Sequence, residues 1–452
     1  SSRRNHQDGT TPRNNEEMKL EMQEIDYSSL KPADWLPTSV KEMKALGWTE
    51  VDVVLFSGDA YVDHPSFGVA VIGRTLQAAG YRVAIVPQPN WQDDLRDFRK
   101  LGIPRLFFGI SPGAMDSMVN HYTANRRRRS DDAYTPGGRH GMRPDYPSVV
   151  YSKILKDLYP DVPVIAGGIE ASLRRLSHYD YWQDRLRPSL IVDAPVDMIS
   201  YGMGEKTVIE IARRRDAGGN LADMTDVPQT VVLLSRSLMP DADDNNIILS
   251  SYEQCLKDKK KQSENFKHIE QQSNSMSGGA VLWQVTGDKV VKVNPMYPAM
   301  TQGEIDAAFD LPYTRLPHPR YKGKRIPAYE MIRHSVNLHR GCFGGCAFCT
   351  ISAHQGKFIA SRSQRSILHE VRQVTRMPDF KGYISDLGGP SANMYAMGGK
   401  DKSICARCLR PSCLHPSPCR NLDGDHRPLL DIYRKVDAFP GVKKSFIGSG
   451  VR

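Results

Sequence analysis

The chain has 452 residues, a formal net charge of +10 at pH 7, and a composition that is 40% hydrophobic and 25% charged. This length is enough for two or three domains with buried cores of their own. No apolar run approaches the roughly 18 residues that span a bilayer, so we expect a soluble chain and exclude a helical membrane protein. The basic excess permits contact with nucleic acid but is not a motif for it.

The opening residues of the chain are polar. Residues 1–15 lack any apolar period and contain no stretch like the hydrophobic core of a signal peptide. We therefore expect residues 1–30 to form a disordered tail.

The first half of the chain alternates strand-like and helix-like segments. Repeated strand–helix units imply a parallel sheet with helices on both faces. We therefore predict an α/β fold that begins with a Rossmann-like, doubly wound domain over residues 31–215. Strands are expected at residues 53–56, 82–86, 105–109, 162–166 and 197–200, and helices at 69–79, at 148–159 and from about 205.

Ligands of doubly wound sheets bind beyond the carboxyl ends of the strands. Three glycine-containing turns follow expected strands, at residues 57–59, 167–170 and 202–204, and we expect them to surround one crevice. The same glycines also suit simple tight turns. None of the turns has the GxGxxG pattern of a nicotinamide site. His64 directly follows Asp63, which departs from the Asp-x-His-x-x-Gly pattern of cobalamin-binding domains and argues against cobalt ligation by His64.

The sharpest basic run is formed by the four arginines at residues 126–129, which precede Ser130, Asp131 and Asp132. This pattern favours a solvated loop with its own counter-charges over an RNA contact. Nucleic acid is therefore a possible partner that no motif supports.

Residues 216–330 are expected to form a connector of mixed character. Residues 258–272 are polar and helix-forming, and the apolar runs at 281–284 and 290–293 predict a hairpin around Gly287 and Asp288. Pro312, Pro317 and Pro319 then indicate an extended linker into the next domain.

Cysteine is the most informative residue type in this sequence. Seven of the eight cysteines lie between Cys342 and Cys419, and the eighth is Cys255. Secreted disulfide proteins are shorter and carry a signal peptide. The clustering therefore indicates metal binding in a reducing cytoplasm.

The first cysteine group has the spacing C-x3-C-x2-C and follows an expected strand at residues 335–339. Three thiolates this close in sequence can bind three irons of a cubane cluster and leave the fourth iron open to a ligand. The glycines Gly341, Gly344 and Gly345 let the backbone fold tightly around the sulfurs, and Phe348 is expected to shield the cluster. The three cysteines are Cys342, Cys346 and Cys349.

Two other interpretations of this spacing remain open. One is a structural zinc site with His339 or His354 as the fourth ligand. The other is a disulfide, which the expected compartment disfavours.

The loop resembles the radical S-adenosylmethionine (SAM) signature CxxxCxΦC, with Phe348 as the aromatic residue. The resemblance implies that the open iron chelates SAM and that the reduced cluster cleaves it to a 5′-deoxyadenosyl radical. It also implies a reductant such as a flavodoxin or ferredoxin. Residues 364–376 and 382–387 suit the first helix and the second strand of the barrel. Where the superfamily often has Gly-Gly-Glu, this chain has Gly388, Gly389 and Pro390, so the resemblance assigns Gly388 and Gly389 to SAM binding.

The chain resembles one family within that superfamily more closely, the YgiQ-type radical SAM proteins. The resemblance extends over nearly everything after about residue 30, and it implies a class of chemistry without naming a substrate. The matching phrases are SGDAYVDHPSFG (57–68), DDAYTPGGR (131–139), GGIEASLRR (167–175), SYEQCLKDKK (251–260), LPYTR (311–315), RGCFGGCAFC (340–349) and DLGGPSANMY (386–395).

The second cysteine group comprises four cysteines within fifteen residues, Cys405, Cys408, Cys413 and Cys419. Four thiolates fill a tetrahedral zinc site or ligate all four irons of an auxiliary cluster. His415 and His426 are spare candidate ligands. The spacing leaves the identity of the metal open.

Residues 331–452 are therefore expected to form the first half of a radical SAM partial (β/α)6 barrel, with a cysteine-rich insertion at 391–428. A helix at 429–439 and a third strand at 444–448 precede the last residue, Arg452. About half of such a barrel is missing, so we hypothesise that the chain is a fragment. Two alternatives are a non-catalytic, metal-stabilised binding protein, with RNA as one candidate partner, and an inactive remnant.

Overall fold

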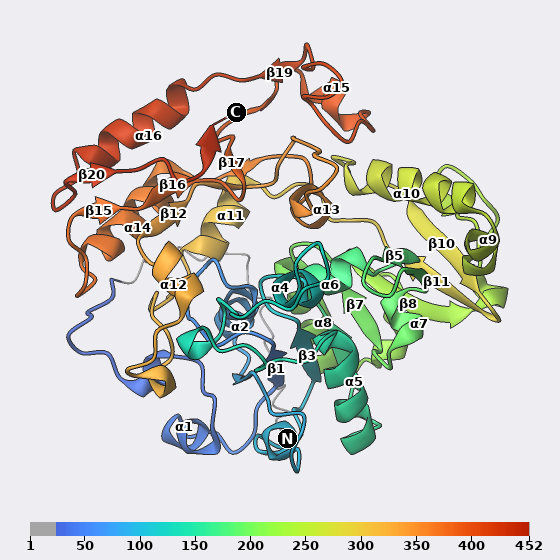
Figure 1. The fold of residues 1–452 in the computed structure, drawn as a ribbon, viewed down its shortest axis with the longest axis horizontal. Coiled ribbons are helices and arrows are strands. Elements are labelled where there is room, and N and C mark those ends of the chain that lie inside the picture. Colours follow the sequence, from blue (N-terminus) through green and yellow to red (C-terminus); the bar gives the residue numbers. More distant parts are fainter. Residues whose placement is uncertain (1–23, 452) are drawn as a thin grey trace, which may run out of the picture.

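The computed structural model describes residues 24–451 (Figure 1). The expected disordered tail lies outside this range up to residue 23. Its last residues, 24–30, contact both domains. Glu24 forms ion pairs with Arg372 and Arg376, Tyr27 packs against the apolar core of the C-terminal domain, and Leu30 packs against that of the N-terminal domain. Within residues 24–451, no helix is long and apolar enough to cross a bilayer.

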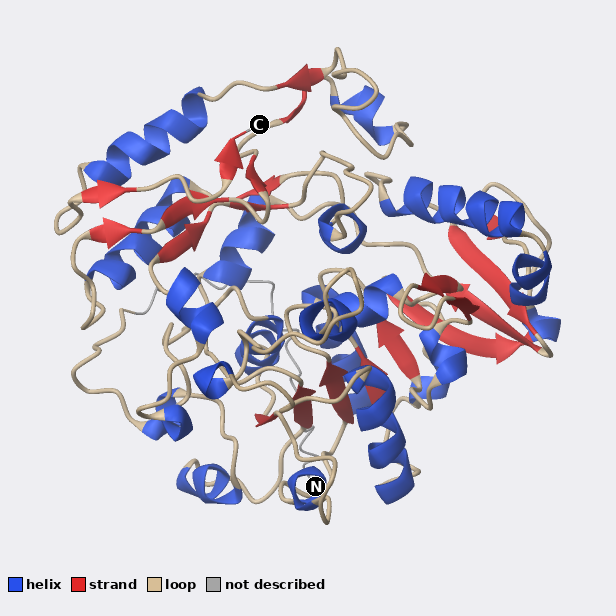
Figure 2. Ribbon diagram, viewed as in Figure 1, coloured by secondary structure: helices blue, strands red, loops and turns tan. Residues whose placement is uncertain are grey.

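A sheet of nine strands organises the N-terminal part, in the order β2-β1-β3-β4-β7-β8-β11-β10-β9 (Figures 1 and 2). Its first five strands run parallel. They have the 2-1-3-4-5 order of a flavodoxin-like doubly wound sheet, as predicted. The five strands are β1 (Val53–Ser57), β2 (Val83–Pro87), β3 (Phe107–Ser111), β4 (Val164–Ala166) and β7 (Met198–Ser200).

Side chains of these strands alternate between two apolar cores, one on each face. Leu55 and Ile85 contribute to one core, together with residues of α2 (Gly68–Ala78) and α8 (Glu205–Asp216). Phe56 and its neighbours contribute to the other, together with α5 (Pro147–Leu158). Successive residues of a strand face opposite sides, so a strand covered on both faces is apolar throughout. This is why the uninterrupted apolar runs predicted these strands.

Residues 216–330, which we interpreted as a connector, continue the same sheet. Strand β8 (Thr230–Ser235) pairs antiparallel with β7. Beyond it lie β11 (Lys289–Val293), β10 (Val281–Thr286) and β9 (Asn246–Ile248). The expected hairpin is confirmed, because β10 and β11 pair antiparallel on either side of Gly287 and Asp288. The sequence analysis missed the sheet extension because the pairing of β8 with β7 is set by tertiary contacts and not by a local pattern.

The C-terminal domain has three neighbouring parallel strand positions, as predicted for the start of a barrel. Strand β12 (Ser335–Asn337) pairs with β16 (Asp386–Gly388), and β15 (Tyr383–Ile384) pairs with β20 (Lys444–Ser445). Figure 2 shows this set of short strands apart from the large sheet. Helices α14 (Gln364–Thr375) and α16 (Arg427–Asp437) pack against these strands around one apolar core.

The remaining helices and strands complete the fold. The helices are α1 (Val40–Ala45), α3 (Arg96–Arg99), α4 (Ser117–His121), α6 (Gly168–Leu173), α7 (Leu190–Asp193), α9 (Tyr252–Lys257), α10 (Lys259–Ser273), α11 (Gln302–Phe309), α12 (Pro327–Ile332), α13 (Ile351–Gln355) and α15 (Lys402–Ala406). The strands are β5 (His178–Asp180), β6 (Arg185–Arg187), β13 (His339–Arg340), β14 (Ala360–Ser361), β17 (Ala392–Asn393), β18 (Gly398–Gly399), β19 (Leu422–Asp423) and β21 (Gly450–Val451).

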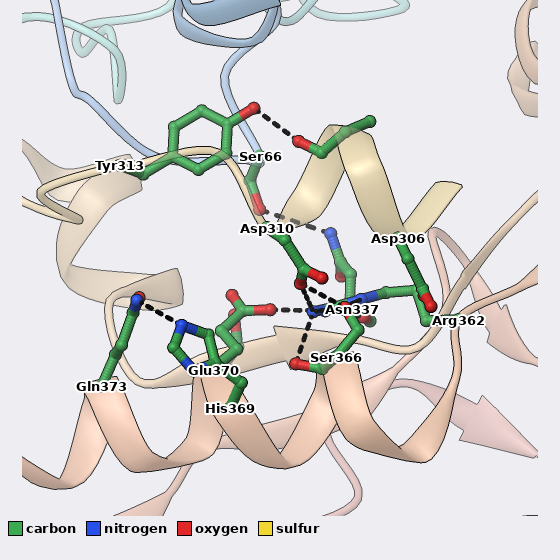
Figure 3. Close-up of polar contacts among 12 residues, drawn as sticks. Ser66, Asp306, Asp310, Tyr313, Asn337, Arg362, Ser366, His369, Glu370 and Gln373 are labelled. Carbon is green, nitrogen blue, oxygen red and sulfur yellow. Dashed lines mark hydrogen bonds and ion pairs between the residues drawn. The ribbon is translucent and has the colours of Figure 1, made fainter. Parts of the chain in front are cut away.

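A buried ionic network lies where the linker meets the barrel. Glu370 on α14 forms ion pairs with two arginines, Arg315 and Arg362, through different carboxylate oxygens. All three residues are at most 4% exposed. Figure 3 shows Glu370 and Arg362 among their polar neighbours, with Asn337 of β12 reaching Ser66 of the N-terminal domain. The network therefore fixes the first barrel strand and its helix against the linker.

Candidate functional site

A cavity of 1140 Å³ lies between the two domains. One wall follows the carboxyl ends of β3, β4 and β7, where ligands of doubly wound sheets bind. The other wall comes from β12, β13, α13 and the turn after β16. Residues on the first wall include Ser111, Gly167, Gly168, Gly202, Met203, Gly204 and Glu205, and residues on the second include Asn337, Arg340, His354, Asp386, Gly389 and Ser391.

Two of the three expected turns line this cavity, at residues 167–169 and 202–204. The turn at residues 57–59 does not. Its Asp59 is buried, forms an ion pair of 2.7 Å with Arg143, and accepts a 2.6 Å hydrogen bond from the backbone of Ala114. These contacts fold the turn into the protein, and residues 113–116 take its place at the cavity. His64 is also buried and lies outside the cavity lining.

The first cysteine loop lies beside the cavity, between strands β13 and β14. Cys342 is buried, whereas Cys346 and Cys349 are half-buried. The hydroxyl of Ser391, which lines the cavity, is 3.5 Å from the sulfur of Cys342. The residues that directly follow the loop, 350, 351, 354 and 355, line the cavity as well. A cluster on these cysteines would therefore adjoin the space that both domains enclose.

Glycine is required where the loop turns around its sulfurs. A Cβ atom at Gly344 would lie 3.4 Å from the sulfur of Cys342 and 3.6 Å from that of Cys346. Gly345 has a left-handed φ of +59°, and a Cβ there would lie 2.7 Å from Ser412. The loop thus leaves free the space between two thiols that a larger residue would fill, which fits a cluster held by thiolates.

Within residues 24–451, no three His, Cys, Asp or Glu side chains are gathered into a preformed metal-ligand set. Binding of a metal would therefore have to draw the thiolates of either group together. Coupling between metal binding and local folding is usual for thiolate sites.

The two histidines considered as zinc ligands are engaged elsewhere. The Nε2 atom of His339 accepts a 3.0 Å hydrogen bond from the backbone of Met394. The Nδ1 atom of His354 lies 2.8 Å from the hydroxyl of Ser172, in the N-terminal domain. Burial lowers the pKa of both imidazoles to about 4, so both are neutral at pH 7. These contacts weaken the interpretation of the first group as structural zinc.

Phe348 does not shield the loop in this structure, because its side chain is 91% exposed. The apolar contacts of the loop come from Phe343 and Met394, which share a small buried core with Cys342. The signature aromatic therefore marks the outer surface of the loop, in contrast to the prediction.

The two glycines assigned to SAM lie in different environments. Gly389 lines the cavity, and a Cβ atom there would collide with the ring of His339. The carbonyl of Gly388 accepts a 2.7 Å hydrogen bond from the backbone of Leu338. Gly389 is consequently the better placed of the two to offer backbone atoms to a ligand.

A buried ion pair that was not predicted from the sequence lies at the cavity wall. Arg340 precedes the cysteine loop, and its guanidinium pairs with Glu205 at the start of α8. Both residues line the cavity, and both are less than 10% exposed. The position of Arg340 directly before the cysteine motif could have indicated a role at the site. Nothing in the sequence indicated that Glu205 is its partner.

The second cysteine group lies against the first. The backbone of Cys413 donates a 3.0 Å hydrogen bond to the carbonyl of Phe343. Burial, together with the neighbouring Cys408, raises the thiol pKa of Cys405. Burial also raises the thiol pKa of Cys413, an effect that the Lys357 ammonium opposes.

The arginines at residues 126–129 are exposed, as predicted for a solvated loop. Arg126 donates a 2.7 Å hydrogen bond to the carbonyl of Tyr181, at the cavity wall. The expected counter-charge Asp132 is instead buried and paired with Arg143.

Comparison with known proteins agrees with the motifs. The family model described as Radical SAM N-terminal matches residues 35–335. A UPF0313 protein of Bacteroides thetaiotaomicron is 65% identical over 431 residues, which are 93% of this chain and 69% of that protein. A UPF0313 protein of Porphyromonas gingivalis is 65% identical over 419 residues, covering 93% of this chain and 66% of that protein. The chain therefore spans about two thirds of the length of these relatives.

Among solved structures, the chain is similar to TsrM from Kitasatospora setae, a radical SAM methyltransferase determined with cobalamin and a 4Fe–4S cluster bound. The TM-score is 0.40 at 15% sequence identity, over 76% of this chain and 48% of that chain. The family match and the curated relatives identify the chain, which belongs to the YgiQ-type radical SAM family, the UPF0313 proteins.

Proposed function

We propose that this chain carries the cluster-binding site of a radical SAM enzyme, in which Cys342, Cys346 and Cys349 hold a 4Fe–4S cluster. When bound, the cluster would supply an open iron for SAM and the electron that cleaves SAM to a 5′-deoxyadenosyl radical.

The position of the cysteine loop carries this proposal. The loop adjoins a cavity of 1140 Å³ that both domains line. Ligand pockets for a single small molecule usually measure about 300–1,000 Å³. The cavity is therefore large enough for a molecule of the size of SAM, directly beside the proposed cluster.

The surrounding residues have roles that follow from their contacts. The ion pair of Arg340 with Glu205 ties the strand before the cysteine loop to the N-terminal domain. The contact of His354 with Ser172 ties down the helix after the loop in the same way. Gly389 offers its backbone at the cavity wall without a side chain. Together these contacts hold the loop at the interface between the domains.

A reductant such as a flavodoxin or ferredoxin would supply the electron. Phe348, beside Cys349, is 91% exposed. We propose this exposed side of the loop as the point of approach for the donor. We also propose a reducing compartment such as the cytoplasm, because the clustered cysteines must stay reduced to bind metal as thiolates.

Metal analysis after anaerobic cluster reconstitution tests the proposal. We expect Cys346→Ala to lose about four irons and the matching sulfide relative to the wild type. The matched control is Cys255→Ala, because Cys255 is a buried cysteine outside both groups and its loss should leave iron unchanged. An equal amount of iron per chain in the Cys346→Ala variant and the wild type would refute the proposal.

A further inference from the structure

A buried positive charge that contacts the cysteine-rich insertion has no acidic partner among residues 24–451. Lys357, in the segment between α13 and β14, is 1% exposed and forms no ion pair there with an Asp or Glu side chain. Its ammonium donates a 2.5 Å hydrogen bond to the carbonyl of Arg410 and lies 3.5 Å from the sulfur of Cys408. A buried ammonium is costly unless an anion compensates its charge. The groups available near Lys357 to supply that anion are thiols.

Other contacts of the second cysteine group resemble the surroundings of thiolates. The side-chain amide of Asn421 points an N–H at the sulfur of Cys405, at 3.4 Å. Gly399 lies so close to the same sulfur that a Cβ atom would collide with it. Hydrogen bonds to sulfur stabilise thiolates that ligate metals.

Backbone hydrogen bonds draw the four cysteines into two turns. The amide of Cys408 donates to the carbonyl of Cys405 at 3.1 Å, and that of Cys419 donates to the carbonyl of Cys413 at 2.8 Å. All four side chains are half-buried. The insertion thus folds back on itself, with its cysteines in one region around Lys357.

This region also supports the first cysteine loop. The hydroxyl of Ser412 donates a 2.7 Å hydrogen bond to the carbonyl of Gly344. Gly345 packs against Ser412 so closely that any side chain there would meet it. A change in the fold of the insertion would therefore reach the loop of Cys342, Cys346 and Cys349 through backbone contacts.

We propose that Cys405, Cys408, Cys413 and Cys419 hold a second, four-thiolate metal centre and that Lys357 is its counter-charge. Zinc with four thiolates and a 4Fe–4S cluster with four thiolates both carry net negative charge. Either centre would therefore compensate the buried ammonium. Among the described residues, neither cysteine group has its ligands already gathered around a metal position. We therefore expect the sulfurs of both groups to move together when metal binds.

Metal content distinguishes this centre from the radical SAM site. We expect Cys408→Ala and Cys413→Ala each to lose about one zinc per chain while the iron bound through Cys346 is retained. A wild type with about eight irons, of which each variant loses about four while zinc is unchanged, would also support the four-thiolate centre and identify it as an auxiliary cluster. If zinc and iron both match the Cys255→Ala control, the proposal is overturned. The proposed function is tested separately, by the iron content of Cys346→Ala.

Chelator challenge tests the role of Lys357. Lys357→Met keeps a long side chain but removes the charge, so we expect the metal of the second centre to be released at least about tenfold faster. Lys357→Arg should restore slow release, whereas a purely steric role would be served as well by methionine. The thermal midpoints of metal-free wild type and metal-free Lys357→Met show whether the variant folds. The midpoint of the variant should equal or exceed that of the wild type, because replacement of a buried charge by an apolar group is often neutral or stabilising. Should Lys357→Met fold poorly, Lys357→Gln offers the same test. Equal release rates in the wild type and the neutral variants would refute the counter-charge.

Discussion

Replacement of Glu370 by glutamine should be among the most destabilising single changes in the C-terminal domain. Glu370 lies between Arg315 and Arg362, and each carboxylate oxygen pairs with one guanidinium. Both arginines are at most 1% exposed. The substitution keeps the volume of the side chain but removes the negative charge that both arginines share.

The magnitude follows from the partners that remain. Loss of one partner from a buried ion pair costs about 3–5 kcal/mol, because the other charge stays buried without compensation. Arg362 retains a distant carboxylate, Asp310, at 3.9 Å. Among residues 24–451, Arg315 keeps the backbone carbonyls of Arg333 and Ser335 as hydrogen-bond acceptors, at 3.1 and 2.8 Å. We therefore expect Glu370→Gln to lower the free energy of unfolding by about 4 kcal/mol.

The chain contains a matched control for this experiment. Glu210 also pairs with two arginines, Arg213 and Arg214, but on the surface of α8, where Arg213 is 65% exposed. Surface pairs contribute about 0–1 kcal/mol, so Glu210→Gln should cost no more than that. Urea unfolding followed by circular dichroism measures both variants. Equal costs at the two sites would show that the buried network does not have the stabilising role inferred from its geometry.

Two further predictions concern the cysteine loop and His339, which lines the cavity. Gly345 has a left-handed φ, and a Cβ atom there would lie 2.7 Å from Ser412. Gly345→Ala should therefore lower reconstituted iron at least about twofold, and full iron content in this variant would contradict the inferred packing of the loop. Burial lowers the pKa of His339 from 6.5 to about 4 in the folded state. The unfolded chain therefore binds a proton at His339 more readily than the folded chain does. The free energy of unfolding is unaffected by this group above pH 6.5 and falls as the pH drops from 6.5 toward 4. This loss of stability is up to about 3 kcal/mol. His339→Gln should therefore flatten the pH dependence of urea unfolding between pH 6.5 and 4. An unchanged pH profile in the variant would contradict the lowered pKa of His339.

The parallel sheet and the cysteine loop were predictable because their signals are local. Apolar runs such as residues 53–56 of β1 are buried on both faces, and the cysteine spacing is contained within eight residues. Features set by distant residues were not predictable. The ion pair between Glu205 and Arg340 joins positions 135 residues apart.

Other differences have the same origin. Asp59 lies away from the cavity because it forms an ion pair with Arg143. The segment from β8 to β11 belongs to the large sheet because β8 pairs antiparallel with β7. The exposure of Phe348 depends on how the loop lies against its neighbours, which its position before Cys349 does not reveal.

The most direct test of the central claim is whether SAM binds the cluster that Cys342, Cys346 and Cys349 are proposed to hold. We would reconstitute the chain anaerobically, reduce it with dithionite, and record its electron paramagnetic resonance spectrum with and without SAM. The account predicts a reduced 4Fe–4S signal whose line shape changes when SAM is added, because one iron lacks a cysteine ligand. Cys346→Ala should lose this SAM-dependent change, and Cys255→Ala should keep it. A 4Fe–4S signal that SAM leaves unchanged in the wild type, or a SAM-dependent change that persists in Cys346→Ala, would contradict the account.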